Sequence, residues 1–181
     1  MGWIILIVVV LIALFVISNY NTLVKLRNNV KDQWAQIEVL LKRRADLIPN
    51  LVETVKGYTK HEIDTLEAVI NARNKAVSAT TPEDEMKANG ELTGALNRLF
   101  ALTESYPDLK ANTNFMDLQA NLKETEDKIS YGRQFYNDSV LKNSIKLEMF
   151  PSNIVASIFG FKPEAFFEAS EEDRKNPQVK F

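Results

Sequence analysis

The chain opens on an uninterrupted apolar run. Residues 1–17 contain no charged side chain, and the first charged residue is Lys25. An uncharged stretch of about 20 residues, at about 1.5 Å per helical residue, matches the hydrocarbon thickness of a bilayer. Trp3 and Tyr20 stand near its two ends, where aromatic side chains are enriched at membrane–water interfaces. The pattern predicts a transmembrane anchor over residues 1–19.

A cleaved signal peptide is the alternative interpretation of this run. It requires a basic segment before the apolar residues and a small-residue cleavage site after them, and the sequence shows neither. We therefore favour a retained anchor. Lys25, Arg27 and Lys31 follow the span, whereas only the α-amino group precedes it. The positive-inside rule then predicts that the C-terminal domain is cytoplasmic.

Beyond the span, apolar residues recur at steps of three and four, which is typical of amphipathic helices. The first stripe predicts that the helix continues to about Arg44, with a core face of Tyr20, Leu23, Val30, Trp34, Ile37 and Leu41. Pro49 predicts a helix boundary or a kink near residues 46–48, because proline disrupts the preceding helical turn. A second helix over residues 48–79 would bury Val52, Val55, Ile63, Leu66, Ile70 and Val77.

Two further helices follow. Thr81 and Pro82, with Asp84 at the capping-box spacing, predict the start of a third helix, and Pro107 predicts its end. Asn114 and Asp117 predict the cap of a fourth helix, which runs to about Glu148. We therefore expect an all-α fold: an N-terminal transmembrane helix continuing into an antiparallel up-down four-helix bundle over residues 20–149. A short apolar C-terminal tail (residues 150–167) and a polar, disordered end (residues 168–181) complete it.

Composition excludes several chemistries. The chain has no cysteine, one histidine (His61) and a net charge of −2. Disulfides, thiolate zinc sites and a cysteine nucleophile are therefore impossible, and a dinuclear carboxylate site lacks its second histidine. No serine-hydrolase or phosphate-loop motif is present. We predict no enzyme activity, no metal, no cofactor and no nucleic-acid partner.

Two groups of residues are candidates for interaction. Lys42, Arg43 and Arg44 form a cationic cluster, although cations in the last turn of the predicted first helix would also balance its dipole without a ligand. The tail concentrates apolar side chains within a few positions, which are Ile154, Val155, Ile158, Phe159 and Phe161. This segment could cap its own bundle, contact a neighbouring subunit or lie in the membrane interface. The sequence leaves these three alternatives open.

Several blocks of sequence resemble one family. They read YNTLVKLRNNV (residues 20–30), QWAQIEV (33–39), LKRRADLIPNLVETVKGY (41–58), YPDLKANTNF (106–115) and FPSNIVASIFGF (150–161). From Tyr20 to Phe167 the chain resembles LemA proteins. The resemblance implies a bacterial inner (plasma) membrane protein with one N-terminal span and a helical, bundle-like domain, and it implies no catalytic activity. Some relatives carry a lipobox cysteine where this chain reads Ile17-Ser18-Asn19, so this member should keep its helix.

These features predict a membrane-anchored scaffold that associates with further copies of itself as a homo-oligomer. Subunits confined to a membrane meet at a raised effective concentration, which favours assembly. A monomeric adaptor that presents its bundle to another membrane protein is the alternative. A bundle that senses a ligand is a further, minor alternative.

Overall fold

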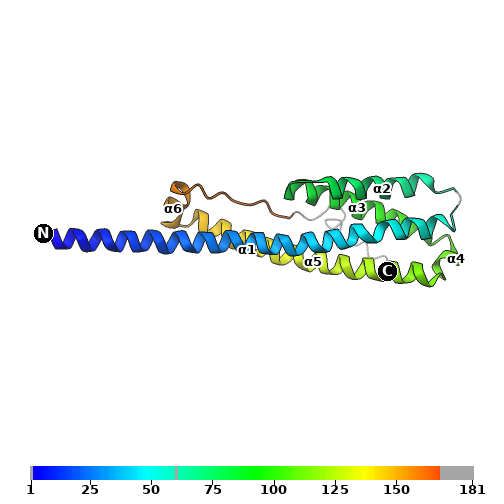
Figure 1. The fold of residues 1–181 in the computed structure, drawn as a ribbon, viewed down its shortest axis with the longest axis horizontal. Coiled ribbons are helices and arrows are strands. Elements are labelled where there is room, and N and C mark those ends of the chain that lie inside the picture. The colour runs from blue at the N-terminus through cyan, green and yellow to red at the C-terminus, as the bar shows by residue number, and fades with distance from the viewer. Residues whose placement is uncertain (1, 60, 168–181) are drawn as a thin grey trace, which may run out of the picture. The chain divides into compact units, whose positions relative to one another are not determined.

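The computed structural model describes residues 2–59 and 61–167, and every regular element in them is a helix. Figure 1 shows their order: α1 (Gly2–Lys56), α2 (Ile63–Ser78), α3 (Pro82–Thr103), α4 (Pro107–Lys110), α5 (Thr113–Glu148) and α6 (Ser152–Ile158). The predicted all-α class is confirmed. The disorder predicted for residues 168–181 lies outside the described residues.

The first part of α1 is long and apolar enough to cross a membrane. An 18-residue window near its N-terminus has a mean hydropathy of 2.8, and only 6% of that window is buried. Its large apolar side chains, among them Trp3, Leu11 and Phe15, are exposed. A helix that is apolar all round and almost entirely unburied suits a lipid surrounding. The predicted long apolar N-terminal helix is therefore confirmed, and it is a candidate membrane span.

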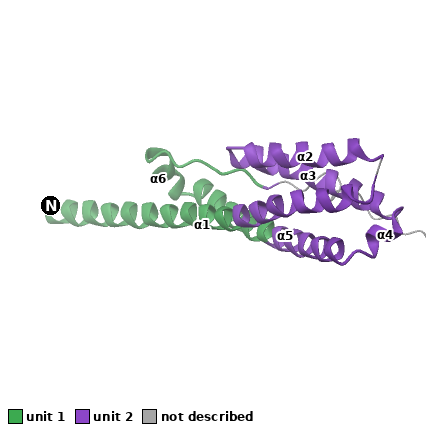
Figure 2. Ribbon diagram, turned by 45° about the vertical axis from the view of Figure 1, so that its right-hand side comes forward, with its two compact units in different colours: residues 1–36, 132–166 green, residues 37–131, 167–181 purple. Residues whose placement is uncertain are grey.

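The chain divides into two compact units, coloured separately in Figure 2. Unit 1 contains Met1–Gln36 and Gly132–Phe166, and unit 2 contains Ile37–Tyr131 and Phe167–Phe181. Helices α1 and α5 contribute residues to both. In unit 1, a buried cluster of Leu23, Val155 and Ala156 joins α1 to α6.

Unit 2 has a larger core. Four long helical segments and the short α4 contribute to one cluster of buried apolar side chains: Ile48, Leu51, Val52, Val55, Leu66, Val69, Ala72, Leu92, Leu96, Leu99, Leu109, Phe115 and Leu122. Steps of three and four within each helix place these residues on one face. Burial of this face is the main source of stability for helices of this length.

The predicted stripe of the first helix is largely confirmed. Leu23, Val30, Ile37 and Leu41 are buried, and so is Trp34. The Trp34 ring packs in unit 1 against the ring of Tyr136, with centroids 5.4 Å apart. Tyr20 is exposed, in contrast to the expectation.

The predicted helix boundary near Pro49 is wrong, because α1 continues through Pro49 to Lys56. Proline lacks an N–H group, so it leaves the carbonyl of the residue four positions earlier without its helical partner. That carbonyl belongs to Ala45, and it accepts a hydrogen bond from Nε of Arg73 on α2 at 3.3 Å. A side chain from another helix thus replaces the bond that Pro49 cannot make.

The break between the first two long helices falls instead at residues 57–62, where Gly57 follows the last residue of α1. Because α2 is a separate helix that begins at Ile63, it turns a different face toward the core than the single helix predicted over residues 48–79. Leu66, Val69 and Ala72 form its buried face. Ile63, Ile70 and Val77, predicted to be core, are exposed instead.

The start of α3 is confirmed: the Thr81 hydroxyl accepts a hydrogen bond from the Asp84 N–H at 3.2 Å and donates one to its carboxylate at 2.8 Å. Pro107 begins α4 and does not end α3, which stops at Thr103. The cap of α5 is Asn112, not Asn114, because its side-chain oxygen accepts from the Phe115 N–H at 3.0 Å. The predicted end at Glu148, just before Phe150 and Pro151, is confirmed.

The role of Arg73 at Pro49 can be tested with a double-mutant cycle. We expect Arg73→Ala to lower the free energy of unfolding more in the wild type than in a Pro49→Ala background. With alanine at position 49, the new N–H can bond the Ala45 carbonyl, so that carbonyl no longer needs Arg73. The coupling should be about 0.5–1.5 kcal/mol in denaturant melts. Equal effects of Arg73→Ala in both backgrounds would contradict this explanation.

Candidate functional site

Among the described residues of unit 2, the most enclosed charged side chain is that of Arg44 on α1, which is 1% exposed. Its Nη1 atom donates to the Thr93 hydroxyl at 2.9 Å and to the Glu126 carboxylate. Its Nη2 atom donates to the side-chain oxygen of Asn89 at 2.7 Å and to the Asn89 carbonyl at 3.2 Å. One guanidinium therefore joins α1 to α3 and α5.

The partners of Arg44 are themselves held in place. The Asn89 side-chain amide donates to the Glu85 carbonyl at 2.8 Å, and the Thr93 hydroxyl donates to the Asn89 carbonyl at 3.1 Å. A buried charge is tolerated only when it is paired and hydrogen-bonded. The network meets this requirement for both terminal nitrogens of Arg44, while its Nε atom has no partner among the described residues.

The structure separates the three predicted cationic residues. Lys42 is exposed and pairs with Asp46 at 3.1 Å, and Arg43 is exposed and lies 3.9 Å from the Glu124 carboxylate. Arg44 is enclosed by its own chain. The expectation that the cluster occupies the last turn of a helix is wrong, since α1 continues for about three further turns. Only Lys42 and Arg43 remain available to a partner.

Two clefts flank the Arg44 network in unit 2. One has a volume of about 650 Å³ between α3 and α5, with Thr93, Phe100, Met116 and Glu126 among its lining residues. The other has a volume of about 350 Å³ and is lined by side chains of both charges, namely Glu38, Lys42, Asp46, Arg73 and Glu85. Burial raises the pKa of the Glu85 carboxyl, and the negative charge of Glu38 raises it further.

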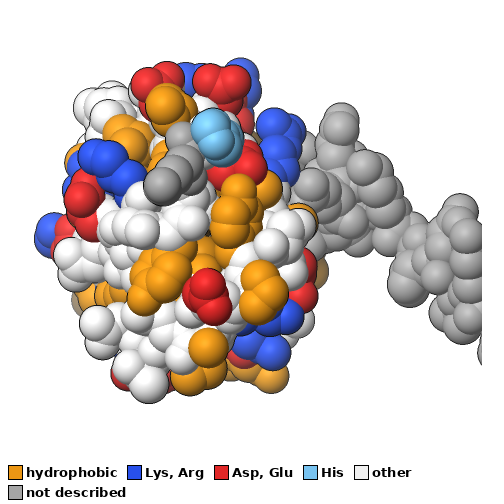
Figure 3. Space-filling model, turned by 90° about the vertical axis from the view of Figure 1, so that its right-hand side faces the viewer, with side chains coloured by type: hydrophobic (Ala, Val, Ile, Leu, Met, Phe, Trp, Pro, Cys, Tyr) orange, Lys and Arg blue, Asp and Glu red, His pale blue; other side chains and the backbone are white. Residues whose placement is uncertain are grey.

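The described residues include no group of three metal-ligating side chains. His61 is exposed, and Figure 3 shows the histidine at the surface of a face where acidic and basic side chains are intermingled. Nearby, the Tyr106 hydroxyl donates to the Glu62 carboxylate at 2.9 Å, and this bond raises the pKa of Tyr106. The contact ties the loop before α2 to the loop before α4, which is a structural role.

The second candidate region is the tail in unit 1. The Tyr20 ring on α1 contacts the rings of Phe159 (centroids 4.8 Å apart) and Phe161 (5.7 Å). The Arg27 guanidinium lies 5.0 Å from the centroid of the Phe161 ring, a cation–π contact. Val155 is buried against α1, whereas Ile154, Ile158 and Phe159 remain exposed. The tail thus folds onto its own chain with one face and leaves the other uncovered.

Sequence reasoning missed the partners of Arg44, namely Asn89, Thr93 and Glu126. Asn89 and Thr93 are one turn apart on α3 and lie in the helical phase of Leu92 and Leu96. Polar residues within a predicted apolar face were the available signal. Their hydrogen-bond partner, Arg44, is 45 positions from Asn89 and 49 positions from Thr93 in the sequence.

The fold and the apolar start of α1 define an all-helical protein with a candidate N-terminal membrane anchor. The sequence pattern of the LemA family matches residues 33–181. The chain belongs to the LemA family, which confirms the resemblance seen in its sequence.

Relatives carry two kinds of name. Protein LemA of Metamycoplasma hominis is 28% identical, over 87% of this chain and 73% of that protein. Magnetosome protein MamQ 2 of Paramagnetospirillum magneticum is 27% identical over 84% of this chain, and Magnetosome protein MamQ of Magnetospirillum gryphiswaldense is 24% identical over 83%. The chain spans 65% of the length of each of these two magnetosome proteins.

The Arg44 network predicts the effect of removing its counter-charge. Glu126→Gln should lower the free energy of unfolding by about 2 kcal/mol, because the buried guanidinium loses its paired charge. Glu124→Gln, two residues earlier on α5 and exposed, should have a smaller effect. Denaturant melts of both variants provide the comparison. Equal effects would mean that Arg44 does not depend on Glu126.

The raised pKa of Glu85 predicts a pH-dependent effect. A carboxyl whose pKa is higher in the folded state favours folding while protonated, and this contribution is lost as the pH rises through the folded-state pKa. Glu85→Gln should therefore raise the melting temperature at pH 7. The gain should vanish below the ordinary glutamate pKa of about 4.3. Glu83→Gln is the matched control, because Glu83 shares the first turn of α3 with Glu85 but is exposed. It loses the charge that the helix dipole favours without relieving any burial, so it should give no gain.

Proposed function

We propose that this LemA-family protein is a non-catalytic, membrane-anchored scaffold that associates with further copies of itself. In this proposal residues 1–19 anchor the chain in the bacterial inner membrane. Residues 20–149 form an antiparallel up-down four-helix bundle in the cytoplasm. The basic residues Lys25, Arg27 and Lys31 after the span support the orientation, and the shared core of unit 2 supports a bundle.

The observation that carries self-association is an exposed apolar stripe on α2. Ile63, Ile70 and Val77 are 62%, 40% and 58% exposed, and they follow one another at intervals of seven residues. A seven-residue repeat keeps apolar residues on one side of a helix that packs against another helix. All three side chains are β-branched and apolar. We call these residues the α2 stripe.

The charges beside the α2 stripe favour a second copy of this chain as its partner. By helical phase, Glu67 and Arg73 lie on opposite sides of the stripe. Asp64 and Lys75 lie on other faces of α2, and Lys75 pairs with Glu91 of its own chain at 3.0 Å. In an antiparallel pair centred on Ile70, Glu67 of each copy lies level with Arg73 of the other. Opposite charges then flank the apolar contact on both sides, whereas parallel pairing would place like charges together.

The membrane anchor strengthens such a contact. A stripe of three residues is small for an interface between freely diffusing proteins. Confinement of both copies to one membrane raises their effective concentration, so that a weak contact suffices. Lys42 and Arg43, which are exposed on α1, are further candidates for contact with a neighbouring copy.

We expect the detergent-purified full-length chain to have a molar mass, by light scattering, of at least two copies of 20.6 kDa. Ile70→Lys should reduce the mass to one copy, because it places a charge in the middle of the α2 stripe. The matched control is Val39→Lys, since Val39 is also an exposed, β-branched residue in a helix of unit 2 (69% exposed).

Circular dichroism spectra should show equal helix content in all three proteins, which separates loss of assembly from loss of fold. A wild-type monomer at every concentration would refute self-association and favour the monomeric adaptor. An unchanged oligomer in Ile70→Lys would show that the α2 stripe is not the contact.

A further inference from the structure

The inference concerns α6, which has apolar side chains on both of its faces. Its inner face, with Val155 and Ala156, is buried in unit 1 against α1. Its outer side carries Ile154 and Ile158, which is 72% exposed, beside the uncharged polar residues Asn153 and Ser157. Exposed Phe150 and Phe159 flank the helix. A surface helix of a soluble protein normally turns polar residues outward. The outer side of α6, with large apolar and uncharged polar side chains together, is therefore suited to the boundary between water and lipid.

The charge pattern of this segment supports the same conclusion. No charged residue lies between Glu148 and Lys162, although charged residues make up 25% of the chain. Surfaces that face water or the rim of a protein interface generally carry charges. An uncharged segment that is rich in Ile and Phe is typical of the boundary between lipid head groups and acyl chains.

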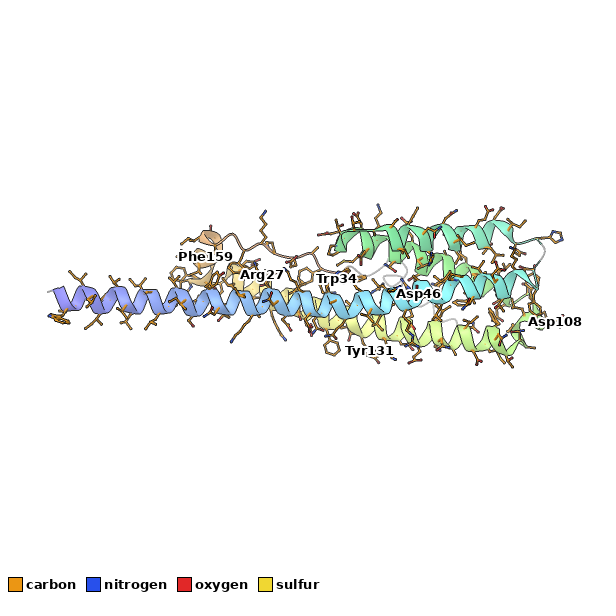
Figure 4. The ribbon with its side chains drawn as sticks, viewed as in Figure 1. Arg27, Trp34, Asp46, Asp108, Tyr131 and Phe159 are labelled. Carbon is orange, nitrogen blue, oxygen red and sulfur yellow. The ribbon has the colours of Figure 1, made fainter. Side chains whose placement is uncertain are left out.

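The position of α6 along α1 identifies the partner. Phe159 and Phe161 contact Tyr20, and Val16 packs against the cluster of Leu23, Val155 and Ala156. In Figure 1, α6 lies beside the part of α1 that follows the exposed apolar run, and Figure 4 shows the labelled Phe159 next to α1. All of these residues belong to unit 1. The tail is thus fixed to α1 where the candidate span ends.

The length of the span places this region at the bilayer surface. The helix over residues 2–17 is about 24 Å long at about 1.5 Å per residue. The hydrocarbon core of a bilayer is about 30 Å thick. A bilayer crossed by this helix therefore extends to the level of Ser18 and Tyr20, where α6 packs. Lys25 and Arg27 follow within two turns, at a level suited to head groups.

We infer that α6 lies in the membrane interface, with Ile154, Ile158 and the preceding Phe150 inserted among the lipids at the base of the anchor. The partner is the lipid surface itself, and the contact is continuous with the lipid-facing side chains of α1. Anchoring then has two points, the span and α6. The α2 stripe belongs to unit 2, so this inference does not depend on the self-association proposed above.

Because the chain has no cysteine, a single introduced thiol can carry a spin label at a chosen position. We would label Ile158→Cys in the full-length protein, reconstituted in vesicles of phosphatidylcholine and phosphatidylglycerol. The control is Val39→Cys, whose position is similarly exposed at 69%. Relaxation by oxygen, which partitions into lipid, is compared with relaxation by a nickel chelate, which stays in water.

We expect the ratio of oxygen to nickel accessibility to be several-fold higher at position 158 than at position 39. Ile154→Cys provides a second reading on the same side of α6, should the first variant fold poorly. Equal ratios at positions 158 and 39 would overturn the inference. So would a label at position 158 that neither reagent reaches. In that last case, the spectrum is recorded again after dilution with unlabelled protein. Loss of spin–spin broadening would show that a second copy covers α6, and an unchanged spectrum would show that the protein's own chain covers it.

Discussion

The buried charge of Arg44 is the constraint on which unit 2 depends. Transfer of an ion from water into a protein interior costs several kcal/mol, and that cost is offset only by well-placed partners. Glu126, Asn89 and Thr93 supply them from two other helices. Apolar side chains tolerate sliding of one helix past another better than directional bonds to a guanidinium do. Arg44 therefore fixes how α1 lies against α3 and α5, while the surrounding apolar core supplies most of the favourable energy of burial.

The parts of the fold that could be predicted are those that local pattern determines. The stripe containing Leu23, Val30 and Ile37, the cap at Thr81 and the end of α5 at Glu148 all depend on residues a few positions apart. Hydrophobic period and capping chemistry act over that distance, so the sequence displays them directly.

The predictions that were wrong concern features that depend on residues distant in the sequence. Proline normally interrupts a helix, but α1 continues at Pro49 because Arg73 bonds the carbonyl that Pro49 leaves free. The sequence showed Arg44 as one of three adjacent cations. Its burial follows from partners 45 to 82 positions away. No pattern within one helix reveals such partners.

The position of the break before α2 determines which of its residues are exposed, and the charges near them differ from those near the exposed side of α6. Once α2 begins at Ile63, residues expected in the core lie outside, flanked by charges of both signs. The outer side of α6 also exposes large apolar side chains, beside Asn153 and Ser157, but lies in a segment without charge. Alternating charges limit which protein surface can pair with a stripe, because like charges repel. Lipid acyl chains offer no such complementarity and penalise any charge placed among them. The charges around each surface therefore support a different proposed partner for each: another helix for α2 and a bilayer for α6.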